Sequence, residues 1–407
     1  MSFLRRKFID KKIPILPNGW KIVELPKAAF FQEGPGLRNW QFTKKGIKVI
    51  NVTNLVNGYL DLDKTDRHIS LEEFNEKYTH FEVDEGDIVM ASSGATYCKV
   101  AVVRDIDLPL MMNTSVIRYK PLNGVDYNYL KSYLESSFFK TQIDFLITGG
   151  AQPNFGPVHI KQSLIVLPTE PEQKAISNII STWDAAITDT QNLIQQLKLR
   201  KKGLMQQLLT GKKRLSGFDG EWEIARGNEL FKNHSNKNHD GELEVLSATQ
   251  DQGVIPRSET GIDIKYDPKS LKNYKKVEIG DFVISLRSFQ GGIEYSRYEG
   301  IVSPAYTVLK ESKPIAKDFY REYLKTTDFI NKLNSIIYGI RDGKQISYKE
   351  FGTLKIHYPP IDEQNAIAKV IATADEEIKS FVKKLESLEN QKKGLMQQLL
   401  TGQKRVI

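Results

Sequence analysis

The chain contains a single cysteine, Cys98, among its 407 residues. One thiol excludes an internal disulfide framework and any zinc site built from several cysteines. No general base is evident near Cys98, so we expect a small, half-buried residue rather than a nucleophile. The six histidines show no metal-ligand spacing. Two of them, His234 and His239, lie in a polar stretch where solvated side chains are expected.

Long apolar runs are also missing. No run approaches the length of a membrane span. The N-terminal residues 1–7 are not followed by the apolar core of a signal peptide. We therefore expect a cytoplasmic protein that has no membrane partner.

Motifs for covalent chemistry are not found. The Pro-Pro pair at 359–360 lacks the flanking residues of an amino-methyltransferase loop, and residues 208–212 lack the glycine and hydroxyl of a phosphate-binding loop. Acid-x-Lys triplets at 263–265 and 311–313 resemble a nuclease pair, but neither has a matching second acid on a clear strand. We therefore expect no catalytic residue, no metal and no cofactor in this chain.

Charge of neither sign dominates. The formal net charge is +8 with a pI of about 9.1, which is mildly basic and suits a polyanionic partner without proving one. Any nucleic-acid surface on the globular parts must therefore come from local clusters of basic residues.

The sequence does contain a long internal repeat. Residues Lys201 to Gly211 recur unchanged as Lys392 to Gly402, an offset of 191 positions (392 − 201). At the same offset Glu172-Gln173 matches Glu363-Gln364, and further matches follow at Asp184 and Asp375, Leu197 and Leu388, and Arg214 and Arg405. The chain is therefore two tandem copies of one unit, and its natural partner is an object that is itself bipartite.

Both repeated stretches predict a long helix. Apolar positions alternate spacings of four and three residues without a slip, which is a heptad seam. In the first copy the seam is Ile176, Ile180, Trp183, Ile187, Thr190, Ile194, Leu197, Lys201, Leu204 and Leu208. In the second it is Ile367, Ile371, Ala374, Ile378, Phe381, Leu385, Leu388, Lys392, Leu395 and Leu399. We expect the two helices to pack on each other, Gly203 and Gly394 to interrupt them, and Gly211 and Gly402 to end them.

A mixed segment of strands and helices precedes each long helix. Strand-like runs lie at 47–52, 87–91, 100–103 and 115–119, followed by a helical stretch at 128–141. The second segment repeats this order at 244–247, 280–285 and 305–309, with a helical stretch at 317–332. Trp20 in the first segment corresponds to Trp222 in the second. The two globular heads are therefore expected to share a scaffold and differ in their loops.

Several polar, glycine-containing loops of both heads suit DNA contact. Arginine can read guanine edges, Asn and Gln can read adenine edges, and lysine can neutralise phosphates. The candidate residues in the first head are Arg38, Asn39, Gln41, Lys44, Ser92, Ser93, Thr96, Gln152 and Asn154. Those in the second head are Arg287, Ser288, Gln290, Arg341, Lys344 and Gln345. The alternative is that these are ordinary surface loops.

Further motifs lie at fixed places in the chain: Pro-Asn-Gly-Trp at 17–20, Gly86-Asp87, Glu172-Gln173, the repeated helix end and the restart at 214–222. With these motifs, nearly the whole chain resembles the specificity subunit of a type I restriction–modification enzyme. The resemblance implies an α/β (α+β) fold: two globular target-recognition domains joined by two long antiparallel coiled-coil helices, with pseudo-two-fold internal duplication. We expect recognition domains at 1–168 and 215–360 and helical spacers at 169–214 and 361–407.

The resemblance also implies partners. Each recognition domain would read one half of a split sequence in double-stranded DNA. The helices would set the spacing and dock two methyltransferase subunits. Those subunits, together with restriction/translocase subunits, would supply the chemistry of S-adenosylmethionine, ATP and Mg. Residues 3–14 have no clear equivalent before Trp222, which leaves their role open.

Two other classes of function stay open on the residues alone. One is a nuclease or methyltransferase fusion, which would transfer methyl groups or cut DNA by itself. The other is a coiled-coil scaffold that binds only protein, which would show no preference among DNA sequences.

Overall fold

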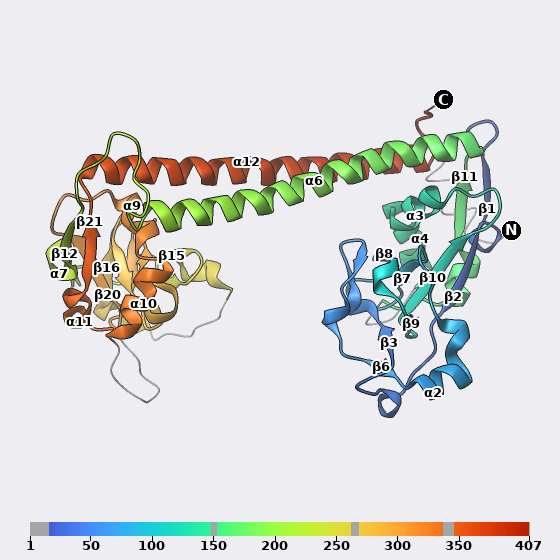
Figure 1. Ribbon diagram of the computed structural model, residues 1–407, viewed down its shortest axis with the longest axis horizontal. Coiled ribbons are helices and arrows are strands. Elements are labelled where there is room, and N and C mark those ends of the chain that lie inside the picture. Colours follow the sequence, from blue (N-terminus) through green and yellow to red (C-terminus); the bar gives the residue numbers. More distant parts are fainter. Residues whose placement is uncertain (1–15, 148–152, 262–267, 337–345, 407) are drawn as a thin grey trace. The chain divides into compact units, whose positions relative to one another are not determined.

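The computed structural model describes residues 16–147, 153–261, 268–336 and 346–406. The chain divides into two compact units. Unit 1 comprises the residues up to Gln191 and those from Lys383 onward, and unit 2 comprises Asn192–Val382. Each unit contains one globular head and one segment of each long helix (Figure 1).

The two long helices are α6, Glu170–Leu208, and α12, Ile361–Leu400. Every predicted seam position is buried or partly buried, which confirms the heptad seam. In unit 1 the ammonium of Lys392 lies 2.5 Å from a carboxylate oxygen of Asp184, and in unit 2 Lys201 lies 2.7 Å from both carboxylate oxygens of Asp375. The helix segments are therefore antiparallel in each unit, with a lysine of the seam paired to an acid.

The predicted interruptions at Gly203 and Gly394 are wrong, because both helices run through these positions. A single glycine in a helix costs only about 1 kcal/mol relative to alanine, which the packed seam outweighs. The predicted ends are confirmed. Gly211 and Gly402 have φ of 71° and 73°, in the left-handed region that ends helices.

Head 1 is built on a four-stranded sheet with the order β2-β10-β7-β8. All neighbouring strands in this sheet are antiparallel. A three-stranded sheet, β6-β3-β9, and the pairs β1-β11 and β4-β5 complete its strands. The strands are β1 Lys21–Glu24, β2 Ala29–Glu33, β3 Ile47–Ile50, β4 Leu55–Val56, β5 Tyr59–Leu60, β6 His68–Ile69, β7 Ile88–Ala91, β8 Val100–Val102, β9 Leu110–Met112, β10 Val116–Pro121 and β11 Leu164–Leu167. The helices are α2 Leu71–Glu73, α3 Tyr127–Glu135, α4 Ser137–Leu146 and α5 Pro157–Gln162.

Head 2 repeats this plan with the sheet β13-β20-β17-β18 and the pairs β12-β21, β14-β15 and β16-β19. Its strands are β12 Glu223–Arg226, β13 Phe231–Asn233, β14 Leu246–Thr249, β15 Gly253–Pro256, β16 Lys275–Val277, β17 Phe282–Ile284, β18 Glu294–Tyr295, β19 Gly300–Val302, β20 Thr307–Glu311 and β21 Lys355–Tyr358. The helices are α7 Gly227–Leu230, α8 Ser288–Gly291, α9 Lys317–Tyr323, α10 Thr327–Ser335 and α11 Tyr348–Thr353. All predicted strands are present within one or two residues, and the shared scaffold is confirmed.

Each predicted helical stretch that follows the sheet is two helices rather than one. In head 1 the break falls at Ser136, whose hydroxyl accepts the backbone N–H of Phe139 and begins α4. In head 2 Thr326 does the same for Phe329 and begins α10. A hydroxyl residue at an N-cap position starts a new helix, so both copies turn at the same point.

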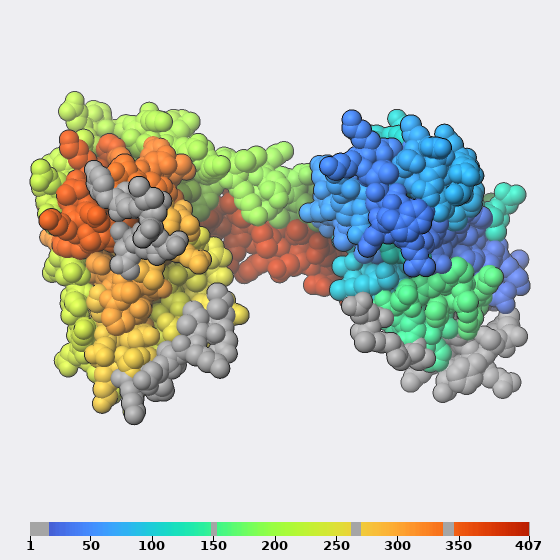
Figure 2. All heavy atoms as spheres, turned by 90° about the horizontal axis from the view of Figure 1, so that it is seen from below, coloured from blue at the N-terminus to red at the C-terminus, as the bar shows by residue number. Residues whose placement is uncertain are grey.

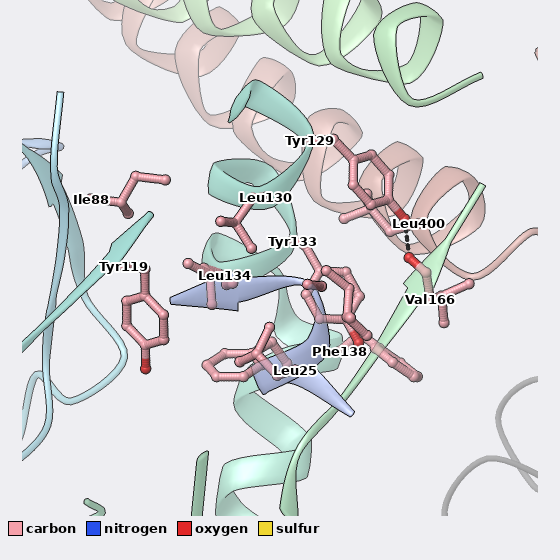
Figure 3. Packing of buried hydrophobic residues seen from close by; sticks show 14 of the residues in the cluster. Leu25, Ile88, Tyr119, Tyr129, Leu130, Tyr133, Leu134, Phe138, Val166 and Leu400 are labelled. Carbon is pink, nitrogen blue, oxygen red and sulfur yellow. Dashed lines mark hydrogen bonds between the residues drawn. The ribbon is translucent and has the colours of Figure 1, made fainter. Parts of the chain in front are cut away.

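The core of unit 1 joins the head to both long helices. Tyr129, Tyr133 and Leu134 of α3 are fully buried, and Leu400 of α12 belongs to the same cluster (Figure 3). The hydroxyl of Tyr129 donates to the carbonyl of Val166 at 2.6 Å, so this buried polar atom is satisfied. The core of unit 2 likewise combines head residues with Leu208 of α6, Leu209 directly after it, and Ile367 and Ile371 of α12.

One buried carboxylate stands at the start of each long helix. In unit 1 Glu172 accepts hydrogen bonds from the indole N–H of Trp20 at 3.0 Å and from Arg405 at 2.8 Å. In unit 2 Glu363 accepts the indole N–H of Trp222 at 2.8 Å and two bonds from the Arg214 guanidinium at 2.6 Å. The arginine comes in each case from the segment that follows the end of the other long helix. The repeated residues therefore make the same contacts in both units.

The glutamine after each carboxylate fixes the head to its helix. Gln173 donates to the carbonyl of Pro168 and accepts the backbone N–H of Asp126. Gln364 makes the matching bonds to Pro359 and Ala316. The repeat of Glu-Gln thus marks the junction between helix and head.

Candidate nucleic-acid interface

Two loops of head 1 leave its main sheet at the same end of the strands, and the segment that precedes α5 reaches the same place. Val116, at the start of β10, pairs with Ala91 at the end of β7, and Ile117 pairs with Glu33 at the end of β2. The segments after Glu33 and after Ala91 therefore begin side by side. Pro153 joins them, because its carbonyl accepts the backbone N–H of Gly94 at 3.1 Å. This edge carries the described candidate residues of head 1.

The first loop, residues 34–46, is held from within by Gln41. Its side-chain oxygen accepts the backbone N–H of Arg38 at 2.8 Å, and its amide donates to Glu73 at 2.6 Å and to the Tyr78 hydroxyl at 3.1 Å. Gln41 is buried, so it shapes the loop and is not free to reach a base. Arg38, Asn39 and Lys44 are exposed on the same loop.

The second loop follows β7. Ser92 is fully buried, and its hydroxyl has no hydrogen-bond partner among the described residues. Ser93 forms a backbone bridge with Asn154, and the side chains of Thr96 and Asn154 are exposed. The structure therefore brings Ser93, Thr96 and Asn154 together, whereas the buried Ser92 can only support them. Gln152 lies outside the described residues.

The corresponding edge of head 2 lies at the start of β20. Thr307 pairs with Ile284 at the end of β17, and Leu309 pairs with Asn233 at the end of β13. The loop after Ile284 carries the exposed Arg287 and Gln290. Its Ser288 is buried and accepts the backbone N–H of Ser285 at 2.8 Å. Ser288 therefore shapes this loop, and Arg341, Lys344 and Gln345 lie outside the described residues.

The segment 234–243 occupies the place in head 2 that residues 34–46 occupy in head 1. From the sequence this stretch is expected to be a solvated polar loop, and none of its residues is among the candidate contacts. The structure shows Lys237 and Asn238 exposed, while His239 is held by the carbonyl of Tyr274 at 2.9 Å. The equivalence of the two segments comes from topology, because both follow the first strand of the main sheet.

A buried ion pair lies behind the candidate loop of head 2. Glu294 of β18 is almost fully buried and accepts a bond from Lys325 at 2.6 Å, and the same ammonium donates to the carbonyl of Gln250 at 2.9 Å. The amide of Gln250 donates to Gln290 at 3.1 Å. Burial raises the pKa of Glu294 to about 7, which the nearby Lys325 only partly opposes.

This raised pKa predicts a pH-dependent stability of unit 2. An ordinary Glu titrates near 4.5, so between that pH and about 7 the folded chain holds more protons than the unfolded chain. The free energy of unfolding should therefore fall as pH rises through this window, by on the order of 2 to 3 kcal/mol. Glu294→Gln should remove the dependence and be the more stable form at pH 8.

Pulse proteolysis in urea at pH 5 and pH 8 measures the free energy of unfolding at each pH. The amount of each protected peptide from unit 2 is the readout. Glu299→Gln is the matched control, because Glu299 is half exposed and paired with Lys276 in the same unit. If the wild type and Glu294→Gln respond alike to pH, the interpretation of Glu294 is wrong.

Burial raises the pKa of the Cys98 thiol to about 12, so this thiol stays protonated at neutral pH. In the part of the chain that the structure describes, no group of three or more His, Cys, Asp or Glu side chains is placed to hold a metal ion. None of the helices within the described residues has the length and apolar character that would let it cross a membrane.

Comparison with known proteins identifies the family. The profile described as the type I restriction modification DNA specificity domain matches twice, at residues 17–199 and 221–390. Over 428 aligned residues the chain is 24% identical to a protein of Methanocaldococcus jannaschii assigned as the type I restriction enzyme MjaX specificity subunit. That alignment covers 99% of this chain and 98% of the relative.

Solved structures share the fold. One, from work on complex assembly and conformational transition of the type I R-M system, has a TM-score of 0.60 at 16% identity, covering 95% of this chain and 98% of that one. The HsdS subunit of Thermoanaerobacter tengcongensis has a TM-score of 0.53 at 15% identity with the same coverage. These likenesses agree with the expected α+β fold of two globular domains joined by long helices. With both halves matched by its domain, this chain belongs to the family of type I restriction–modification DNA specificity subunits.

Proposed function

We propose that each head of this specificity subunit reads one half of a split sequence in double-stranded DNA. The observation that carries the proposal is the repeated scaffold with different loops at the same sheet edge. The shared frame holds the loops of both heads in the same orientation relative to the sheet. Because the loops differ in sequence, each head can recognise different bases. A protein with two such heads fits a target made of two short blocks separated by a gap.

The exposed residues of these edges are the proposed contacts. Arg38 and Asn39 in head 1, and Arg287 and Gln290 in head 2, have the donors and acceptors that read purine edges in the major groove. Thr96 and Asn154 supply further polar groups at the edge of head 1. Lys44 suits a phosphate contact, which adds affinity without sequence information. Gln41, Ser92 and Ser288 support the loops from within.

The helices have a second role in this proposal. We infer that 169–214 and 361–407 act as spacers between recognition domains 1–168 and 215–360, and that their outer faces dock two methyltransferase subunits. Restriction/translocase subunits would join the same complex. The chain itself performs no covalent step in this proposal. S-adenosylmethionine, ATP and Mg act on the partner subunits, and the complex works in the cytoplasm, where its DNA substrate lies.

Exchange of one head tests the proposal. Residues 16–168 are replaced by the corresponding head of a family member that has a different target. We expect one half of the methylated sequence to change and the other half and the gap to stay, because the two heads act independently. The measurement is sequencing of methylated bases in cells that carry the hybrid chain and its methyltransferase subunits.

The rival functions give different results in the same experiment. A change in both halves would show coupled heads and would contradict the modular reading. A chain that binds only protein would leave the methylated sequence unaltered by the exchange. Methyl transfer by the purified chain without partners would instead favour a fused enzyme.

A further inference from the structure

Trp40 is a tryptophan displayed to solvent. Its side chain is 80% exposed, whereas Trp20 is buried and Trp183 and Trp222 are partly buried. Trp183 lies in the seam of α6, and the indole of Trp222 bonds to Glu363. The other tryptophans therefore stabilise the frame, whereas Trp40 belongs to none of the hydrophobic clusters formed by the described residues of its unit. An indole carries a large apolar surface, so its exposure calls for a partner that covers it.

The loop that carries Trp40 is fixed on both sides. Leu37 and Phe42 pack against the small cluster that contains Ile47, Val49, Ile69, Phe74 and Met111. Between them Asn39–Gln41 form one turn of 3-10 helix, closed by the bond from Gln41 N–H to the carbonyl of Arg38 at 3.0 Å. Gln41 is also tied to Glu73 and Tyr78. Trp40 is thus held outward by its neighbours, and a contact made by its indole costs little ordering of the loop.

The surroundings of Trp40 are basic. Residues 34–50 contain Arg38, Lys44, Lys45 and Lys48 and no Asp or Glu. The exposed Arg67 joins them, with its guanidinium 5.0 Å from the centre of the Phe42 ring. Lys48 lies on β3, Arg67 directly precedes β6, and the other cations lie in the loop before β3, all within the residues coloured blue in Figure 2. The acid that contacts the loop from α2, Glu73, is bonded by the amide of Gln41. An exposed aromatic in a stretch whose own charges are all positive matches a polyanion better than an apolar protein surface.

We propose that Trp40 packs its indole against the DNA half-site that head 1 reads, as a positioning contact beside Arg38 and Asn39. This inference rests on the proposed function of head 1 and deepens it. An apolar contact at the centre of the loop excludes water and fixes the distance at which the neighbouring polar side chains meet the base edges. Its contribution is independent of phosphate charge, and that independence separates it from the contribution of Lys44.

Affinity at several salt concentrations tests this assignment. The complex of the chain with its methyltransferase subunits is titrated with a duplex that the wild-type complex selects from a random library. The duplex is about 40 base pairs long, or roughly four turns of DNA, so that it can hold both half-sites and the gap. We expect Trp40→Ala to weaken binding about tenfold or more, and Trp40→Phe to recover most of the loss. The slope of log K against log salt should stay unchanged for both variants. Lys44→Ala should lower that slope by about one.

Fluorescence gives a second readout. Acrylamide quenches exposed indoles, and the contribution of Trp40 is the difference between the wild-type and Trp40→Phe complexes. We expect the selected duplex to protect this contribution from quenching. Because Trp40 is mostly exposed, neither substitution disturbs a core.

The outcomes separate the two proposals. Failure of the wild-type complex to bind any duplex selectively would overturn the proposed function. Selective binding with Trp40 still fully quenchable, or with Trp40→Ala as tight as the wild type, would overturn the assignment of Trp40 and leave the function standing. Protection of Trp40 by a methyltransferase subunit without DNA would also overturn it, since the indole would then be a protein contact.

Discussion

Arg38→Ala is expected to relax base preference at one or two positions of one half-site and to leave the other half-site unchanged. Arg287→Ala should do the same for the other half. Bidentate contact between arginine and guanine contributes about 1–3 kcal/mol of discrimination, or roughly 5- to 150-fold. Both arginines are exposed in loops at the edge of a main sheet, so their loss should not disturb folding. A competition titration over single-base variants of the site measures the effect.

Lys44→Ala is the matched control for this series. Lys44 is exposed on the same loop as Arg38, and removal of a phosphate contact weakens all sequences alike. Titration at two salt concentrations should therefore show a smaller salt slope for Lys44→Ala and altered base preference for Arg38→Ala. If both arginine variants keep every base preference, these arginines are surface residues, whose pairs contribute about 0–1 kcal/mol. The assignment of contacts would then be wrong.

A four-residue insertion after Gln195 of α6, matched by a second one at the opposite position of α12 after Ser380, is expected to lengthen the gap between the half-sites, because the two helices pair antiparallel. Four residues add about 6 Å and slightly more than one turn, so the seam returns to nearly the same face of α6. With 3.4 Å per base pair along each strand, the preferred gap should grow by about one or two base pairs. Sequencing of methylated bases in cells that carry the variant measures the length of the gap directly.

A two-residue insertion at the same point is the control. It rotates the following seam by about 200° and turns its apolar positions away from the partner helix. We expect this variant to lose assembly rather than to shift the gap. An unchanged gap with the four-residue insertion would show that the helices are no ruler, although the heads could still read DNA.

The helical frame could be predicted almost completely from the sequence, because heptad spacing is a local signal. This signal predicted the seam positions and the pairing of the helices. The glycines that end the helices could also be predicted. The prediction failed at Gly203 and Gly394, where helix propensity was weighed without the packing of the neighbouring seam residues. The bonds of Glu172 and Glu363 could not be predicted, because each arginine partner is far away in sequence.

The fold of the two heads could be predicted less completely from the sequence. Strands such as Ile88–Ala91 stood out as short apolar runs, but the edge pairs β1-β11 and β12-β21 join segments that are far apart in the sequence. Among the candidate contacts, residue type identified polar loops and could not separate outward from inward side chains. Gln41 and Arg38 are three residues apart, yet one is buried and the other exposed. The exposure of Trp40 could not be predicted from the sequence, because exposure is a property of the folded loop.

Sequencing of methylated bases across a genome tests the central claim most directly. Cells carry the chain together with its methyltransferase subunits, and their DNA is compared with that of cells lacking the chain. We predict one methylated sequence made of two short specified blocks separated by a gap of fixed length and free composition. A single uninterrupted block, or methylation without sequence preference, would contradict the reading of this chain as a two-headed DNA specificity subunit.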